Sequence, residues 1–372
     1  MIYLDNAATT SPDEEALARA TQFYCESYFN PSASYGGGFA VHTALEEARK
    51  KILSTLADPS KFELIFTSSG TEADNHAIFS GARRGNAVTT AGEHAAVERS
   101  FNELKARGVE PRYAPLHKDG SVNIEKLLSL VDEKTALVSA VHVSNETGAV
   151  NDIFTIAREV KRKNPRTLFH ADGVQAFGKL QVKLAPEIDL YSVSAHKIGG
   201  IKGVGALFKR KSIALSPLIH GGGQESALRS GTENVLGILD FAYAAERRFA
   251  VLKENGARVA ALKAQFCKNL NENFTILSPE NGSPYVLTLS VEGARGEVLQ
   301  RMLWDMGVCV GTGSACSSKN RHSRVLKACG YGEKVLDGVL RVSFSPESTM
   351  EECVKAAQIM NTVAGKFLHL TN

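Results

Sequence analysis

Residues 67–74, with the sequence TSSGTEAD, follow a run of apolar residues and lead into a helix-like segment. At the start of a helix the backbone N–H groups are free and the helix dipole is positive, so Gly70 and Thr71 are suited to bind a phosphate group. A Ser/Thr/Gly cluster before a helix also serves as an ordinary helix cap. The motif alone leaves both interpretations open.

A carboxylate stands at the end of another apolar run. Residues 170–175 have the sequence HADGVQ, which places Asp172 at the carboxyl edge of an α/β sheet, where such sheets collect their ligands. A buried carboxylate needs a partner, and one suitable partner is a pyridinium nitrogen, which the carboxylate keeps protonated so that the ring can take up electrons. A capping aspartate in a strand-to-helix loop is the alternative interpretation.

A lysine occupies a third position of this kind. In residues 192–200, SVSAHKIGG, Lys197 follows an apolar stretch by a few residues and precedes two glycines. An exposed lysine is usually a solvated surface charge. Beside Ser194 and His196, and in a site that also holds a phosphate, the Lys197 amine is instead suited to form a Schiff base.

Together, the three motifs predict a cofactor. Pyridoxal 5'-phosphate requires a phosphate site, a carboxylate for its pyridine nitrogen and a lysine for its aldehyde. The chain contains these three features in that order. Three unrelated motifs with ordinary structural roles would not be expected to occur together in this way. We therefore predict a pyridoxal-phosphate site that includes Gly70, Asp172 and Lys197.

The elements that must position these residues are short buried strands alternating with helices, a pattern typical of a mostly parallel sheet. The expected strands span residues 62–67, 87–89, 136–143, 167–172, 190–194 and 204–208, and helical periodicity covers residues 93–107 and 154–163. This pattern predicts a large α/β domain.

Beyond about residue 250 the order of elements changes. We expect a helix at residues 258–271, a strand at 285–291, a helix at 297–306, a strand at about 340–344 and a closing helix. A chain of 372 residues with 43% hydrophobic content exceeds what one core usually organises. We therefore predict a large domain over residues 15–250, and a smaller α+β domain over residues 1–14 and 251–372.

The composition indicates which kinds of partner and which cellular compartment to expect. The 43 basic and 40 acidic residues give a net charge of +3, too near balance to favour nucleic acid or an anionic membrane as the main partner. The first residues do not form a basic and apolar leader, and no run of about 18 apolar residues occurs, so we expect a cytoplasmic protein with reduced thiols. Cys25, Cys267 and Cys353 fall in helix-like segments and are predicted to be packing residues.

Cys316 has different surroundings. It lies in residues 311–319, GTGSACSSK, a segment of small and polar residues, and basic side chains including Arg324 follow it. Because nearby cations favour the thiolate, we predict that Cys316 is a nucleophile. No metal site is predicted, because four candidate ligands lack the close-spaced pairs of structural zinc sites: Cys309, Cys316, His322 and Cys329.

The chain resembles the cysteine desulfurases of the NifS/IscS type, in the class V aminotransferase family of fold type I enzymes. The resemblance runs nearly end to end and rests on residues 3–10 (YLDNAATT), 69–72 (SGTE), 93–94 (EH), 145–148 (NETG), 170–172 (HAD), 194–197 (SAHK), 221–225 (GGGQE), 228–234 (LRSGTEN) and 313–318 (GSACSS). It implies the fold type I architecture, with a mostly parallel central sheet flanked by helices and a smaller α+β domain.

The resemblance also implies how the cofactor is held. Lys197 would bind it covalently and later move the substrate's Cα proton, Asp172 would pair with the pyridine nitrogen, and Gln175 would reach the ring hydroxyl. His94 would stack on the ring face. The phosphate would be held by Gly70, Thr71, Ser194, His196 and, from the neighbouring subunit of a homodimer, Thr232.

Two further residues are implied at the substrate. Asn145 would contact cofactor and substrate, and Arg341 would bind the substrate carboxylate through its planar fork. Residues 340–342 have the sequence LRV, so the alternation along the strand sets Arg341 opposite its two neighbours but leaves its direction undecided.

The implied reaction converts L-cysteine to L-alanine and leaves the sulfur on Cys316 as a persulfide, for delivery to an acceptor protein in iron–sulfur cluster assembly or tRNA thiolation. Selenocysteine lyase, or another pyridoxal-phosphate lyase or aminotransferase, is an alternative, because most of the motifs hold the cofactor. A non-catalytic sulfur-trafficking scaffold is another, although the chain has Lys197, Asp172 and Cys316. Gly173 departs from the family, which often has alanine there.

Overall fold

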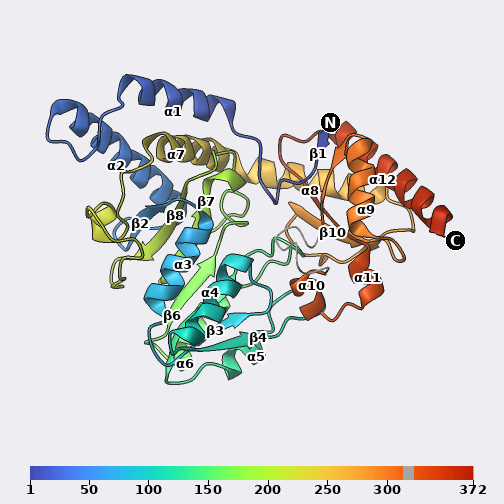
Figure 1. Ribbon diagram of the computed structural model, residues 1–372, viewed down its shortest axis with the longest axis horizontal. Coiled ribbons are helices and arrows are strands. Elements are labelled where there is room, and N and C mark those ends of the chain that lie inside the picture. The colour runs from blue at the N-terminus through green and yellow to red at the C-terminus, as the bar shows by residue number, and fades with distance from the viewer. Residues whose placement is uncertain (313–321, 372) are drawn as a thin grey trace.

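The computed structural model of the protein describes residues 1–312 and 322–371 (Figure 1), so the predicted nucleophile Cys316 lies outside the described residues. Its larger part is built on a seven-stranded sheet in the order β2-β8-β7-β6-β5-β3-β4. The strands are β2 (Phe62–Thr67), β3 (Asn86–Thr90), β4 (Glu110–Ala114), β5 (Thr135–Val141), β6 (Leu168–Asp172), β7 (Leu190–Ser194) and β8 (Gly205–Arg210). The pairs from β4 through β7 are parallel, and β8 runs antiparallel to β2 and β7.

The mostly parallel sheet confirms the predicted fold class, and the predicted strands match the structure to within two residues at each end. The strand β4 was not predicted. It is an edge strand that contains Pro111, and most of its side chains are partly or fully exposed. A search for buried apolar runs misses such a strand because its sequence has none.

Helices cover both faces of this sheet. They are α1 (Glu14–Glu26), α2 (Gly36–Leu56), α3 (Gly70–Gly81), α4 (Ala95–Ala106), α5 (Ile124–Ser129), α6 (Ile153–Lys163) and α7 (Val235–Ala250), with 3₁₀ turns η1 (Ala195–Lys197) and η2 (Glu225–Ala227). Alternate residues of β2 point to opposite sides. Leu64 and Phe66 join a core with α2, α6 and α7, whereas Ile65 packs with Ala73 and Ala77 of α3.

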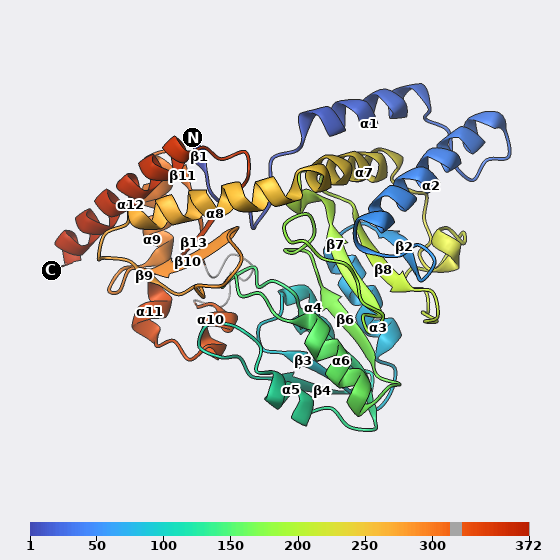
Figure 2. The same ribbon diagram turned by 180° about the vertical axis from the view of Figure 1, so that it is seen from behind.

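The smaller part lies beside the N-terminus (Figures 1 and 2), and α8 (Leu252–Lys268) leads into it from α7. It contains an antiparallel sheet in the order β12-β13-β10-β9 and a parallel pair of β1 with β11. Its remaining elements are β1 (Ile2–Tyr3), β9 (Thr275–Ile276), β10 (Val286–Ser290), α9 (Gly296–Asp305), β11 (Val308–Cys309), β12 (Gly311–Thr312), α10 (Arg324–Ala328), α11 (Glu333–Asp337), β13 (Val339–Ser343) and α12 (Met350–Thr371).

The two largest hydrophobic cores belong to different parts of the chain. One core joins residues from Ala20 to Ala245, and another joins Ile2 and Leu4 with residues from Val259 to Ala364. The N-terminal residues therefore pack with the C-terminal third of the chain. This separation supports the proposed division into residues 15–250 and residues 1–14 with 251–372.

One prediction about the cysteines is wrong. Cys25 lies in α1 but is exposed, because the amphipathic helix buries Ala16 and Ala20 and turns Cys25 outward. Cys353 is buried in α12 and Cys267 is partly buried against the same core, as predicted.

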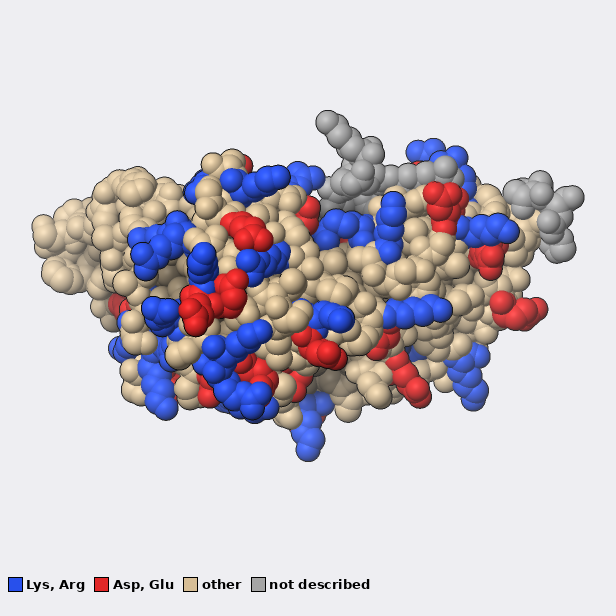
Figure 3. All heavy atoms as spheres, turned by 90° about the horizontal axis from the view of Figure 1, so that it is seen from below, with Lys and Arg blue, Asp and Glu red and all other residues tan. Residues whose placement is uncertain are grey.

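The surface and the helices bear on the predicted partners. Figure 3 shows basic and acidic side chains interspersed on one face of the molecule, in keeping with the near balance of charges in the sequence. None of the described helices is both long and apolar enough to cross a membrane.

Candidate active site

The carboxyl ends of β6 and β7 bring the predicted aspartate and lysine to one edge of the large sheet. Asp172 is the last residue of β6, and its parallel neighbour β7 ends at Ser194. The 3₁₀ turn η1 follows β7 directly, and its last residue is Lys197. Parallel strands gather ligand-binding residues at this edge, and the sequence places both side chains there.

The N-terminal segment lies against this edge. The Lys197 Nζ donates to the carbonyl oxygens of Ala7 at 2.6 Å and Ala8 at 2.7 Å. The Gln175 Nε2 donates to the same Ala7 oxygen at 2.8 Å. Residues 3–10 carry part of the family resemblance, but nothing in their local sequence predicts that backbone carbonyls of this segment contact Lys197.

Asp172 is buried, and its Oδ1 accepts a hydrogen bond from the Val174 N–H at 2.9 Å. Burial raises the pKa of Asp172, and the hydrogen bond from the Val174 N–H and the charge of Lys197 oppose this. A desolvated carboxyl of this kind gains most from a cationic hydrogen-bond donor in contact with it. A protonated ring nitrogen would meet that requirement.

His94 is the N-cap of α4, where its Nδ1 accepts a hydrogen bond from the Ala96 N–H at 3.1 Å. Burial lowers the pKa of His94, although the charge of Asp172 opposes this. The imidazole is therefore a neutral flat ring at neutral pH, and the bond at Nδ1 fixes its orientation. The charges of Lys197, Arg324 and Arg341 lower the pKa of His94 further.

The structure confirms a helix cap at the predicted phosphate site, and phosphate binding there stays a prediction. Ser69 caps α3 by accepting a hydrogen bond from the Glu72 N–H at 3.2 Å, so the capping interpretation is correct. A side chain at Gly70 would meet Val174 at 2.7 Å and Ser194 at 3.5 Å, so the start of α3 lies against the end of β7. Within the described chain, the buried Ser194 Oγ has no hydrogen-bond partner, and a phosphate oxygen would provide one.

His196 lies next to this position. The His196 Nδ1 is 3.1 Å from the Thr9 Oγ1. Burial lowers the pKa of His196 to about 4, and the charge of Lys197 acts in the same direction. The ring is therefore neutral at neutral pH. A neutral imidazole retains one N–H that can donate to an anion.

The structure decides the direction of Arg341. The side chain is only 5% exposed and points from β13 toward the site, where it donates to Asp5 Oδ1 at 2.8 Å and to the Asn145 carbonyl oxygen at 3.1 Å. The Arg341 Nε has no hydrogen-bond partner among the described residues. An unpaired guanidinium N–H in a buried position is suited to receive a carboxylate.

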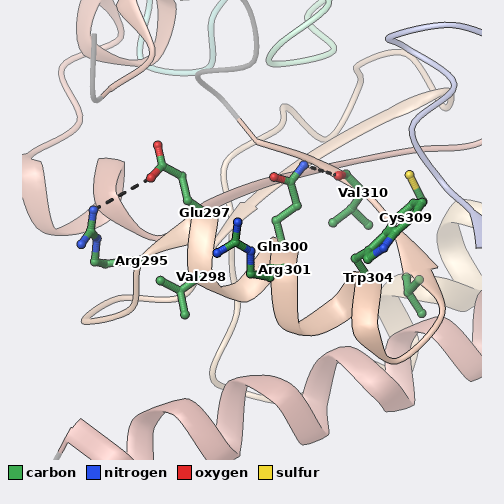
Figure 4. A pocket seen from close by; sticks show the side chains of 9 residues that line it. Arg295, Glu297, Val298, Gln300, Arg301, Trp304, Cys309 and Val310 are labelled. Carbon is green, nitrogen blue, oxygen red and sulfur yellow. Dashed lines mark hydrogen bonds and ion pairs between the residues drawn. The ribbon is translucent and has the colours of Figure 1, made fainter. Parts of the chain in front are cut away.

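Two predicted cofactor residues differ from the others in being exposed. Thr71 and Thr232 are exposed, and in the described part of the chain no hydrogen bond joins Thr232 to another candidate residue. A hollow of about 380 Å³ borders Thr71 and His94. A second hollow of about 670 Å³ lies on α9 and β11 (Figure 4), and its lining includes Trp304 and Cys309 but none of the candidate residues.

The departure at Gly173 has a structural reason. An added Cβ would lie 2.0 Å from the ring of Tyr191, and the Tyr191 hydroxyl is fixed by a 2.8 Å hydrogen bond to His142 Nδ1.

We expect Gly173→Ala to destabilise the protein by about 1–3 kcal/mol, because the packed Tyr191 ring cannot move away without loss of contacts. Denaturant unfolding measures this. Gly256→Ala is the control, since an added Cβ there has open space within α8 and should be neutral or stabilising. Equal stability of the two variants would contradict the explanation.

The comparison with protein families decides the relationship of the chain. A family model described as aminotransferase class-V matches residues 2–355. The chain belongs to this family. A cysteine desulfurase of Gluconacetobacter diazotrophicus is 34% identical over 381 residues, with 100% of this chain and 95% of that protein covered. These matches confirm the predicted resemblance to the cysteine desulfurases of the class V aminotransferase family.

Solved structures confirm the fold. A NifS-like protein superimposes with a TM-score of 0.92 and is 36% identical, with 98% of this chain and 99% of that chain covered. A structure of SspA in complex with cysteine has a TM-score of 0.83 and is 29% identical, with 94% of this chain and 100% of that chain covered. The class V aminotransferase architecture therefore extends over nearly the whole chain.

Proposed function

We propose that this class V aminotransferase is a pyridoxal-phosphate-dependent cysteine desulfurase that converts L-cysteine to L-alanine and passes the sulfur to Cys316. The observation that carries the proposal is the convergence of Lys197, Asp172 and His94 at the sheet edge with Arg341 from the smaller part. The full-length cysteine desulfurase relatives and the cysteine complex of a related structure support the choice of substrate.

The described residues fit pyridoxal phosphate. The partnerless Ser194 Oγ beside Gly70 suits its phosphate, the desolvated Asp172 suits its ring nitrogen, and Lys197 suits its aldehyde. When bound, the cofactor supplies an electron-withdrawing ring that stabilises negative charge at the substrate's Cα. The residues proposed to hold it are Gly70, Thr71, His94, Asn145, Asp172, Gln175, Ser194, His196, Lys197 and Thr232.

Residues of the chain bind the substrate, transfer the Cα proton and attack the substrate sulfur. Arg341, with Asn145 beside it, binds the substrate carboxylate and so fixes the Cα next to Lys197. The Lys197 amine takes up the Cα proton and returns a proton to the product. The Cys316 thiolate attacks the substrate sulfur, so that a C–S bond breaks as an S–S bond forms. One cysteine and one enzyme thiol become one alanine and one persulfide, which balances without an added oxidant.

A homodimer is part of the proposal. Tyr28 and Tyr35, between α1 and α2, and Phe39, in the first turn of α2, are 72%, 56% and 62% exposed, an unusual amount of aromatic surface for one region. Thr232 is exposed as well. A second subunit packed on such surface would bury the aromatic rings, and Thr232 could then serve the partner's cofactor site.

The fate of the sulfur follows from the chemistry of a persulfide, which transfers to another thiol. We propose an acceptor protein in iron–sulfur cluster assembly or tRNA thiolation, and a cytoplasmic location because the exchange needs reduced thiols. The proposed ligands are L-cysteine and that acceptor, without direct contact to nucleic acid or membrane.

The experiment replaces the nucleophile. We expect Cys316→Ser to retain the yellow cofactor but to release alanine from L-cysteine at least about 100-fold more slowly, because serine is a far weaker nucleophile than a thiolate. Cys25→Ser is the matched control, since Cys25 is exposed on α1 and should be dispensable. Alanine release by Cys316→Ser at the parental rate would refute the proposed nucleophile. A preference for L-selenocysteine that survives in Cys316→Ser would point to a selenocysteine lyase instead.

A further inference from the structure

A lysine outside the proposed machinery is buried beside it. Lys179, in the turn that follows β6, is only 8% exposed. Within the described residues no ion pair joins Lys179 to a carboxylate, and its ammonium lies 5.7 Å from the centroid of the Tyr285 ring. Lysines are rarely buried without a counter-charge, because desolvation of the ammonium is costly. The burial of Lys179 therefore needs a structural or functional explanation.

The contact of Lys179 identifies the reason. Its Nζ donates to the Gln175 Oε1 at 2.7 Å. At the other end of the same amide, Gln175 Nε2 donates to the Ala7 carbonyl oxygen at 2.8 Å. Because a lysine amine donates here and a carbonyl can only accept, the amide has one orientation that satisfies both contacts. The hydrogen bond from Lys179 thus holds the Gln175 Oε1 in place, so that the Gln175 Nε2 faces the Ala7 carbonyl oxygen.

The Ala7 oxygen also binds Lys197, whose Nζ lies 2.6 Å from it. The Gln175 amide nitrogen and the Lys197 amine therefore converge on one acceptor. A chain of hydrogen bonds runs from Lys179 through Gln175 and Ala7 to Lys197. This chain joins an otherwise unexplained buried lysine to the residue that is proposed to bind the cofactor.

We propose that Lys179 is a positioning residue, which locks the Gln175 amide against the Ala7 carbonyl and thereby sets the surroundings of Lys197. The inference rests on the proposed function, since it assigns a task toward the bound cofactor. Lys179 itself does not contact the reacting atoms. Its burial beside other cations, Lys197, Arg248 and Arg341, lowers the pKa of Lys179 well below its usual range, and a neutral amine would still donate to Gln175.

The first test reads the cofactor's visible absorbance as pH is varied in the holoenzyme. Lys179→Met releases the Gln175 amide from the Ala7 oxygen, which can then accept from Lys197 alone. The proton on the Lys197 nitrogen should therefore be held more tightly, and the pH midpoint should rise by about 0.5–1 unit. Lys179→Gln, which retains a donor, should recover part of the shift. Lys183→Met is the control, because Lys183 is exposed and donates hydrogen bonds to the Ser54 and Thr55 carbonyls, away from Gln175.

A double-mutant cycle tests whether the effect passes through Gln175. In the Gln175→Ala background, Lys179→Met should cause no further shift, because the amide that Lys179 holds is already gone. A fully additive shift, or an unchanged midpoint in Lys179→Met alone, would overturn the positioning role. A purely structural role would change the unfolding midpoint without moving the absorbance titration.

A crystal structure of Lys179→Met gives a result that does not depend on cofactor chemistry. We expect the Gln175 amide to leave the Ala7 oxygen, and an amide that stays in place would reject the inference. The proposed function fails in a different way: the parental protein would then bind pyridoxal phosphate without a visible band, whatever the position of Gln175.

Discussion

Lys197→Ala should lose the visible band of the bound cofactor and form alanine from L-cysteine at least about 10³-fold more slowly than the parental protein. The amine is proposed both to bind the cofactor covalently and to move the Cα proton, and loss of either task alone costs about 10²–10⁴-fold. Absorbance spectra and an alanine assay measure the two effects separately.

Lys183→Ala is the matched control for this variant. Lys183 is exposed and donates to the carbonyls of Ser54 and Thr55, on the side of the sheet that carries α2. The Lys183→Ala protein should retain the visible cofactor band and form alanine at the parental rate. An active Lys197→Ala protein with an unchanged spectrum would mean that another amine binds the cofactor.

Arg341→Ala should raise KM for L-cysteine by about 30- to 150-fold, with a smaller change in kcat. A charge-assisted contact to a carboxylate contributes about 2–3 kcal/mol, and each 1.4 kcal/mol corresponds to a factor of ten. Arg341→Lys should recover only part of the affinity, because an ammonium cannot reproduce the planar fork. Steady-state kinetics with L-cysteine measures both variants.

Two controls make the result specific. Arg301→Ala removes an exposed arginine from α9 of the same part of the chain and should leave KM unchanged. Asp5→Asn keeps Arg341 but weakens the ion pair that orients it, so an intermediate KM is expected. If Arg341→Ala lowered kcat without any effect on KM, the arginine would act on the reaction rather than on the carboxylate.

The parts of the site that the sequence predicts are those where function depends on local position. Asp172 and Lys197 follow apolar strands, and the sheet gathers strand ends at one edge, so pattern alone places them. Ser194, the last residue of β7, lies at the same edge, but its place in the site is predicted only by the resemblance. The resemblance to a family then assigns their chemistry.

The parts that the sequence does not reveal depend on contacts between distant segments. The Ala7 carbonyl becomes important only because β1 pairs with β11, which anchors the N-terminal segment in the smaller part and carries it across the site. Lys179 looks like a surface residue until its burial is known. The direction of Arg341 is likewise fixed by Asp5 and Asn145, not by the alternation of its strand.

The most direct test of the account is a single turnover of the holoenzyme with L-cysteine in the absence of a reductant. The account predicts one alanine per active site and a persulfide, detected by mass spectrometry as one added sulfur atom on the peptide that contains Cys316. An alanine burst with the added sulfur on another cysteine, or pyruvate in place of alanine, would contradict it.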